Sequence, residues 1–159
     1  MTRRTLLSLI PALGIIGDAT AATASGGATT ALALSDAEWR QRLSPAAYAV
    51  LRKEGTERAF GSALNDEKRR GTYACAGCDL PLFTSDMKFD SGTGWPSFFT
   101  SLPGVVQTKT DFKLILPRTE YHCTRCGGHQ GHVFNDGPKP TGQRWCNNGV
   151  ALSFTPEAS

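Results

Sequence analysis

Four of the five cysteines form two Cys-x-x-Cys pairs, and these pairs restrict the fold more than any other feature of the sequence. They are Cys75/Cys78 and Cys123/Cys126, with residues 79–122 between them. Two such pairs can supply four thiolates to one tetrahedral zinc ion, which closes the site to water and joins two distant chain segments. We therefore predict one structural Zn²⁺ per chain, bound by these four side chains.

Two disulfides, one within each pair, are the main structural alternative for an exported chain. A disulfide inside a Cys-x-x-Cys pair is strained and usually catalytic, and two in one small domain would be unusual. The spacing therefore favours zinc. The 159 residues, 40% of them hydrophobic, are enough for one domain with a hydrophobic core.

Cys146 is the one cysteine without such a partner, and it lies in residues 144–149 (RWCNNG). A single thiol is most often an inert, buried side chain. Arg144 would lie on the same face of a strand as Cys146 and would favour the reactive thiolate. His129 and His132 precede this segment and would suit a metal site, a hydrogen-bonded core or acid/base chemistry. Their neighbouring glycines favour the chemical interpretation.

The first 24 residues predict an export signal of the twin-arginine type. Arg3 and Arg4 precede an apolar run, residues 6–16, that is too short to span a bilayer, and A-x-A cleavage sites end at Ala21 and Ala24. An uncleaved anchor and a chance basic start are the alternatives. We expect a periplasmic protein without stable membrane association after signal removal. Residues 25–34 would form a linker and residues 35–156 the domain.

The charge of the chain gives no support for nucleic-acid binding. The formal net charge is +3, and loss of the predicted signal lowers it to +2. The basic cluster at residues 68–70 follows two acidic residues and is typical of a solvated turn. We therefore expect no nucleic-acid partner.

Two short helices are predicted before a β-rich remainder. Residues 35–38 form a capping-box sequence, and Ser44-Pro45 predicts the start of a second helix that ends at Gly55. His122, just before a Cys-x-x-Cys pair, is expected to face solvent. The segments rich in β-forming residues after Gly71 are 72–74, 112–116, 120–122 and 150–154. The pattern predicts a small, mostly antiparallel β domain with helices at its front.

Several segments together resemble the motifs of the methionine-R-sulfoxide reductases of the B type. They are residues 73–78, 88–98 (KFDSGTGWPSF), 123–126, 131–134 (GHVF), 136–138 (DGP) and 144–148 (RWCNN). The resemblance covers roughly residues 35–154. It implies a mainly β fold of two antiparallel sheets. It also implies reduction of the R epimer of methionine sulfoxide in oxidised proteins, which repairs oxidative damage.

The resemblance also implies roles for particular residues. Cys146 matches the nucleophile that attacks the sulfoxide sulfur and becomes a sulfenic acid. His129 and His132 match the pair that holds and protonates the sulfoxide oxygen. Asn148 matches a polar group that lines the site. A sulfoxide oxygen leaves readily only when protonated, so a thiolate and an acid must meet at one place.

Substrate binding is expected from three further residues. Trp95 and Phe134 resemble the aromatic side of the pocket for the substrate methyl group. Arg144 is added on electrostatic grounds, because its charge would favour the thiolate.

The chain departs from the family pattern at four positions. Thr93 stands where many members have a resolving cysteine, and no spare cysteine exists outside the two pairs. The sulfenic acid would then be reduced by an external thiol, such as a thioredoxin-like protein, or by sacrifice of a zinc ligand. Gln130 replaces a usual leucine, Asn147 a usual aliphatic residue and Gly149 a usual serine, which changes the shape and polarity of the pocket.

Two rival functions fit parts of the same pattern. A zinc-ribbon-like interaction module would keep the fold and have no need of Cys146. A disulfide-handling oxidoreductase would use the Cys-x-x-Cys pairs directly, and it predicts two reducible disulfides and no bound metal.

Overall fold

The computed structural model describes residues 30–114 and 116–158. The predicted export signal and residues 25–29 of the predicted linker lie outside the described residues. Within the described part of the chain, none of the helices is long and apolar enough to cross a membrane.

Two short helices begin the described domain, as predicted. Helix α1 (Asp36–Arg42) begins with the expected capping box, in which the Ser35 side chain and Glu38 hydrogen-bond each other's backbone N–H groups. Helix α2 (Pro45–Lys53) begins at Ser44, whose hydroxyl accepts from the backbone of the first turn. Both N-termini are thus encoded by local sequence.

The end of α2 differs slightly from the prediction. Glu54, and not Gly55, adopts the left-handed conformation that terminates the helix, with φ of 53°. Gly55 follows because a side chain there would meet the Ala49 carbonyl oxygen at 2.8 Å. The apolar face of the helix pair, including Trp39 and Leu51, is buried in the core.

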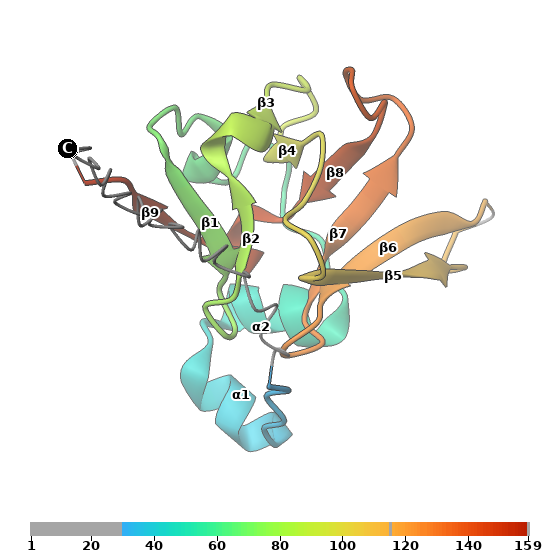
Figure 1. The fold of residues 1–159 in the computed structure, drawn as a ribbon. Helices are drawn as coiled ribbons and strands as arrows, with labels where there is room; N and C mark the ends of the chain where they lie inside the picture. The colour runs from blue at the N-terminus through green and yellow to red at the C-terminus, as the bar shows by residue number, and fades with distance from the viewer. Residues whose placement is uncertain (1–29, 115, 159) are drawn as a thin grey trace, which may run out of the picture.

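The strands form two antiparallel sheets, which confirms the predicted fold class (Figure 1). The three-stranded sheet has the order β2 (Pro81–Thr84), β1 (Gly71–Cys75), β9 (Leu152–Pro156). The six-stranded sheet has the order β3 (Lys88–Phe89), β4 (Ser97–Phe98), β8 (Arg144–Asn147), β7 (His129–Phe134), β6 (Arg118–Cys123), β5 (Val106–Asp111). Three short 3₁₀ turns, η1 (Ala63–Asn65), η2 (Ser85–Met87) and η3 (Gly149–Ala151), complete the described elements.

Aromatic side chains join the two sheets. Tyr73 and Phe83 come from the three-stranded sheet, and Phe98 and Tyr121 come from the six-stranded sheet; all four are fully buried. The rings of Phe83 and Phe98 stack with centroids 4.0 Å apart, and Tyr73 meets Phe98 edge to face at 5.1 Å. Burial of such rings contributes much of the apolar stabilisation of a small domain.

The strand predicted over residues 112–116 is wrong. Strand β5 ends at Asp111 and β6 begins at Arg118, so the described residues of this range, 112–114 and 116, belong to the connection between β5 and β6 (Figure 1). Phe112, Leu114 and Leu116 are 75%, 58% and 76% exposed. Alternating apolar residues form a strand only when a facing surface buries one side, and the described part of the chain provides none for these three side chains.

The last predicted strand is shifted. Val150 lies in the 3₁₀ turn η3, and β9 begins at Leu152. Strand β9 pairs with β1 over its whole length, from Gly71 opposite Pro156 to Cys75 opposite Leu152. The end of the chain therefore completes the sheet that carries the first cysteine pair.

Candidate active site and metal centre

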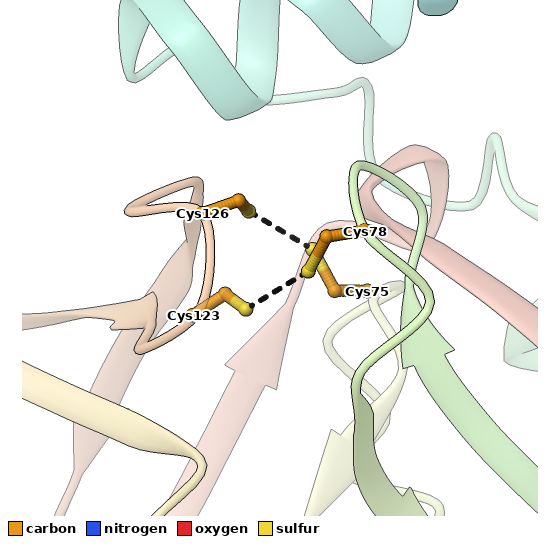
Figure 2. Close-up of side chains that lie close together, drawn as sticks. All are labelled: Cys75, Cys78, Cys123 and Cys126. Atoms are coloured by element: carbon orange, nitrogen blue, oxygen red, sulfur yellow. Dashed lines mark hydrogen bonds between the residues drawn. The ribbon is translucent and has the colours of Figure 1, made fainter. Parts of the chain in front are cut away.

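The two Cys-x-x-Cys pairs meet as the spacing predicted. Cys75 is the last residue of β1 and Cys123 is the last residue of β6. The turn after each strand places the second cysteine of the pair close to the first. Figure 2 shows the four side chains pointing toward one another from these two turns. All four are buried, and their sulfur atoms lie within 4.8 Å of one another.

The sulfur spacings fit a shared metal ion. Sγ of Cys75 is 3.6 Å from Sγ of Cys126, and Sγ of Cys78 is 3.4 Å from Sγ of Cys123. Four thiolates at about 2.3 Å from a tetrahedral zinc would be about 3.8 Å apart, whereas a disulfide needs about 2.05 Å. None of the four thiols is in a disulfide, and the two approaches of 3.6 and 3.4 Å each join one pair to the other. The geometry thus favours a metal centre over two disulfides.

A pocket of about 120 Å³ lies on the six-stranded sheet and contains the fifth cysteine. Its lining residues are Thr56, Trp95, Arg118, Gly131, His132, Phe134, Cys146, Asn147 and Asn148. The structure therefore brings together five predicted site residues: Trp95, His132, Phe134, Cys146 and Asn148. His129 and Arg144 lie outside this lining.

Strand register places the thiol opposite an imidazole. Cys146 on β8 pairs with His132 on β7, and the two side chains share a face of the sheet. Gly131 permits the close approach of these strands, because a side chain there would lie 1.9 Å from the Cys146 carbonyl oxygen. This contact explains one of the glycines that the sequence places beside the histidines.

The Cys146 thiol is partly exposed, and opposing effects act on its pKa. Burial raises the pKa of Cys146, whereas the nearby Arg144 guanidinium and the Thr93 hydroxyl act to lower it. Arg144 is held by Asp136 through two hydrogen bonds of 2.9 Å and stacks over the Phe134 ring at 4.3 Å. The guanidinium therefore acts on the thiol from a fixed position behind the pocket wall.

His132 is anchored by a buried carboxylate. Its Nε2 lies 2.8 Å from Oδ2 of Asp111, and Nη2 of Arg118 approaches the same oxygen at 2.6 Å. The Lys113 backbone N–H and the His132 and Arg118 side chains hold the pKa of Asp111 well below its usual range. An ionised partner fixes the orientation of the imidazole ring.

His129 lies behind His132 and is only 1% exposed. The ring centroids of the two histidines are 5.5 Å apart. Burial lowers the pKa of His129 to about 4, against an opposing effect of Glu120. His129 is therefore neutral near neutral pH, and its direct action on a substrate stays a prediction.

The expectation that His122 faces solvent is wrong. Its side chain is 16% exposed, and its Nε2 lies 2.5 Å from Oε1 of Glu120. Residues i and i+2 of a strand share a face, so His122 follows Glu120 onto the side of the sheet below the end of α2. There Lys109 bridges Glu120 and Glu54, with both N–O distances below 3 Å.

The unusual residues Gln130 and Asn147 contact each other in the fully buried interior. Nδ2 of Asn147 donates to the Tyr121 hydroxyl at 2.8 Å and lies 3.5 Å from Oε1 of Gln130. Nε2 of Gln130 donates to Sγ of Cys75 at 3.2 Å. A chain of hydrogen bonds therefore links the cysteine cluster to the residue next to Cys146.

Asn148 lines the pocket, but both ends of its amide bind backbone. Its Nδ2 donates to the Gln130 carbonyl at 3.0 Å, and its Oδ1 accepts from the Glu57 N–H at 2.9 Å. Gly149 follows because a side chain there would meet the Ser62 hydroxyl at 1.9 Å. The unusual glycine is thus explained by close packing of the loop that precedes β1.

Glu57 is the structural residue that sequence reasoning missed. Its carboxylate accepts from the backbone N–H groups of Gly149 and Val150, and its carbonyl accepts from the Trp95 indole at 3.1 Å. With the bond from its own N–H to Asn148, one residue holds both the pocket wall and the turn after Cys146. These partners lie up to 93 residues away in sequence, so no local pattern could indicate them.

The fold and the site together define a class of protein. A partly exposed thiol, an anchored imidazole and an aromatic wall surround a small pocket, while a separate thiol cluster staples the fold. This is the arrangement of a thiol-based oxidoreductase with a structural metal centre.

The chain belongs to the SelR domain family, which matches residues 43–156. It is 50% identical over 124 residues to a peptide methionine sulfoxide reductase MsrB of Leptospira interrogans, covering 77% of this chain and 95% of the relative. An MsrB of Thiobacillus denitrificans is 52% identical over 124 residues, covering 77% and 94%. An MsrB of Methanosarcina barkeri is 49% identical over 131 residues, covering 82% and 92%.

Proposed function

We propose that this protein reduces methionine (R)-S-oxide in proteins to methionine, with Cys146 as its nucleophile. The observation that carries the proposal is the pairing of the Cys146 thiol with the His132 imidazole in a small, partly aromatic pocket. Family membership and the relatives named peptide methionine sulfoxide reductases support it. Nothing in the described structure favours the non-catalytic module.

The reaction needs a nucleophile and a proton donor at one place. The Cys146 thiolate attacks the sulfoxide sulfur, the oxygen takes up a proton, and oxygen transfers to the thiol as the thioether leaves. One sulfoxide and one thiol thus become one thioether and one sulfenic acid. Two external thiols then return the sulfenic acid to a thiol, releasing water and forming a disulfide.

His132 is the acid that the geometry supports best. It borders the pocket opposite Cys146, and its hydrogen bond to Asp111 holds the ring in place. His129 does not line the pocket, and its burial lowers its pKa and keeps it neutral, so it would act on the substrate only through His132. We assign it a supporting role in orienting His132.

Trp95 and Phe134 supply an apolar surface for the substrate methyl group. Both line the pocket, and its volume of about 120 Å³ suits the end of one methionine side chain. The Trp95 indole is fixed by its hydrogen bond to Glu57, and Phe134 is fixed by the Arg144 guanidinium. The rest of a polypeptide substrate would remain outside the pocket.

Zinc is the metal we propose for the four-cysteine centre. The thiol donor set and the sulfur spacings suit Zn²⁺, which supplies structural cross-linking and no open position for chemistry. Gln130 would donate a hydrogen bond to one bound thiolate.

The reductant is proposed to be an external thiol. Thr93 hydrogen-bonds Ser91 at the position of the usual resolving cysteine, and the other four thiols are buried in the cluster. Attack by one of them on the Cys146 sulfenic acid would require opening of that cluster. A thioredoxin-like protein meets the chemical requirement without such a rearrangement.

Export to the periplasm by the twin-arginine route is also proposed, on the sequence of residues 1–24 alone. This route would carry a folded domain with its metal already bound. Fractionation of cells that express the full chain, with Arg3 and Arg4 replaced by lysine as the control, tests it. Retention of the wild-type chain in the cytoplasm would overturn the proposal.

The enzymatic proposal is tested with separate R- and S-methionine sulfoxide peptides and dithiothreitol as reductant. We expect the mature protein to reduce the R form only, and Cys146→Ser to abolish turnover. Cys146→Ser should retain its metal and its circular dichroism spectrum, which excludes misfolding as the cause. Absence of turnover of either epimer by metal-loaded wild-type protein would refute the enzymatic function.

A further inference from the structure

A second group of metal-ligating side chains lies on β6 and β7, apart from the four cysteines. It consists of Glu120, His122 and His129, and one donor atom from each lies within 4.8 Å of the other two. Nε2 of His122 is 2.5 Å from Oε1 of Glu120, and Nδ1 of His129 is 3.9 Å from Oε2 of the same carboxylate. The carboxylate therefore stands between two imidazoles.

The two ring nitrogens of His129 are buried and lack hydrogen bonds among the described residues. Oε1 of Glu120, by contrast, is approached by Nε2 of His122 at 2.5 Å and by Nζ of Lys109 at 2.9 Å. Glu120 and His129 are each only 1% exposed. A buried polar atom without a partner costs about 1–3 kcal/mol, so the two unpaired nitrogens of one buried ring beside a buried carboxylate need an explanation.

We propose that these three side chains form a binding site for a divalent transition-metal ion such as Zn²⁺, Co²⁺ or Ni²⁺. Two imidazole nitrogens and one carboxylate suit these ions, whereas Mg²⁺ and Ca²⁺ prefer oxygen ligands alone. Bonds of about 2.1 Å place ligand atoms up to about 4.2 Å apart, which matches the observed spacings with small adjustments. The partly exposed His122 side chain gives the ion a route of entry.

Lys109 is the natural competitor of the ion. Its Nζ lies 2.9 Å from Oε1 of Glu120 and 2.8 Å from Oε1 of Glu54, and its side chain is 53% exposed. The ammonium group neutralises the carboxylate when no other cation does so. Binding of a metal would displace it toward Glu54 and solvent, which makes occupancy dependent on metal concentration.

Metal binding at this site would inhibit the enzyme, a consequence that rests on the proposed function. The His129 ring lies 5.5 Å from the His132 ring between centroids. An ion bound to His129 would fix that ring and place a divalent charge beside His132, the side chain proposed to hold the sulfoxide oxygen. The site would therefore make sulfoxide reduction sensitive to excess transition metal.

Titration with Co²⁺ tests the site independently of activity. Protein whose four-cysteine centre is already filled with zinc should take up one further equivalent of Co²⁺. Its visible absorption should be weak and lack the intense sulfur-to-metal bands that thiolate ligands produce. His122→Asn should abolish this uptake, and Lys109→Met should tighten it, because the competing ammonium is gone.

Two further results decide the outcome. Retained zinc and an unchanged circular dichroism spectrum in His122→Asn would show that loss of Co²⁺ uptake is local. No additional Co²⁺ uptake in either wild type or Lys109→Met, or uptake that His122→Asn leaves unchanged, would overturn the proposal. If Co²⁺ binds but excess Zn²⁺ does not slow turnover, the proposed metal site is supported and the proposed inhibition of the enzyme is refuted.

Discussion

The five cysteines lie in two regions of the protein that differ in burial, in neighbours and in the role expected of the thiol. Four thiols gather at the ends of β1 and β6, buried and close to one another. Cys146 stands alone on β8, partly exposed, beside an arginine and opposite a histidine. The comparison shows that neighbours, and not the residue type, decide whether a cysteine stabilises a fold or reacts.

The two regions are also built differently. Each half of the four-cysteine centre comes from a tight turn of a few residues, closed by bonds such as Gly127 N–H to the Cys123 carbonyl at 2.8 Å. The Cys146 pocket is assembled from separate segments, and Glu57 holds two of them. The first region is therefore robust to distant changes, whereas the second depends on them.

Loss of the metal should produce the largest effect and separate the two regions completely. Structural zinc contributes about 10 kcal/mol or more to the folding of small domains, so chelation or Cys75→Ser should abolish cooperative unfolding. Cys146→Ser should change the free energy of unfolding by about 1 kcal/mol or less. Chemical denaturation of both variants, with and without a chelator, measures the contrast. An unchanged midpoint after metal removal would contradict it.

Glu57→Gln should damage the pocket while leaving the metal centre intact. The new amide group would face the backbone N–H donors of Gly149 and Val150, and a hydrogen bond to a charged group contributes about 1.5–3 kcal/mol. We expect kcat/KM for R-sulfoxide peptides to fall about tenfold to a hundredfold, with bound zinc unchanged. Glu157→Gln, at an exposed ion pair with Arg70, is the matched control. Equal activity of the two variants would exclude this role for Glu57.

The pH dependence of alkylation should distinguish Cys146 from the other four thiols. Burial raises its pKa, so the rate of reaction with iodoacetamide should keep increasing as pH rises past the usual range for cysteine. Arg144→Met removes a charge that favours the thiolate. It should move this profile to higher pH and slow labelling at pH 7.5. Arg70→Met should have no effect; an unmoved profile in Arg144→Met would show that the guanidinium does not act on the thiol.

The smallest expected effect concerns the link between the two regions. Gln130→Leu and Asn147→Ile each remove one partner of a fully buried amide pair, and the double variant removes both. We expect the double variant to lose less stability than the sum of the single variants, with a coupling of about 0.5–1 kcal/mol by urea unfolding. Additive losses would mean that the two amides stabilise the protein independently.

Much of the fold was predictable because its signals are local. The capping box at Ser35, the proline after Ser44 and both Cys-x-x-Cys turns act within a few residues and reappear in the structure as expected. The meeting of Cys146, His132 and Trp95 in one pocket was predicted by resemblance to a family, which supplies the strand register that periodicity alone does not.

The errors concern contacts that are distant in sequence. Residues 112–116 alternate in sequence like a strand, but Phe112, Leu114 and Leu116 are exposed and no described segment covers them, so the pattern is misleading. His122 was expected in solvent because its contact with the buried Glu120 could not be foreseen from the sequence. Glu57 belongs to no sequence motif, because its structural role depends on hydrogen bonds to residues 149 and 150, which are distant in sequence.

The pairing of β1 with β9 has a consequence for how the protein is made. Strand β1 can pair with β9 only after β9 has been synthesised. In the same way, Glu57 can form its hydrogen bonds only after residues 148–150 have been synthesised. Contacts of such high sequence separation form slowly, and they form late on a growing chain. A nascent chain that already contains the four clustered cysteines has all the ligands of the proposed metal centre before Cys146 and its pocket are complete. The Cys146 pocket is therefore the last part of the domain to form during synthesis.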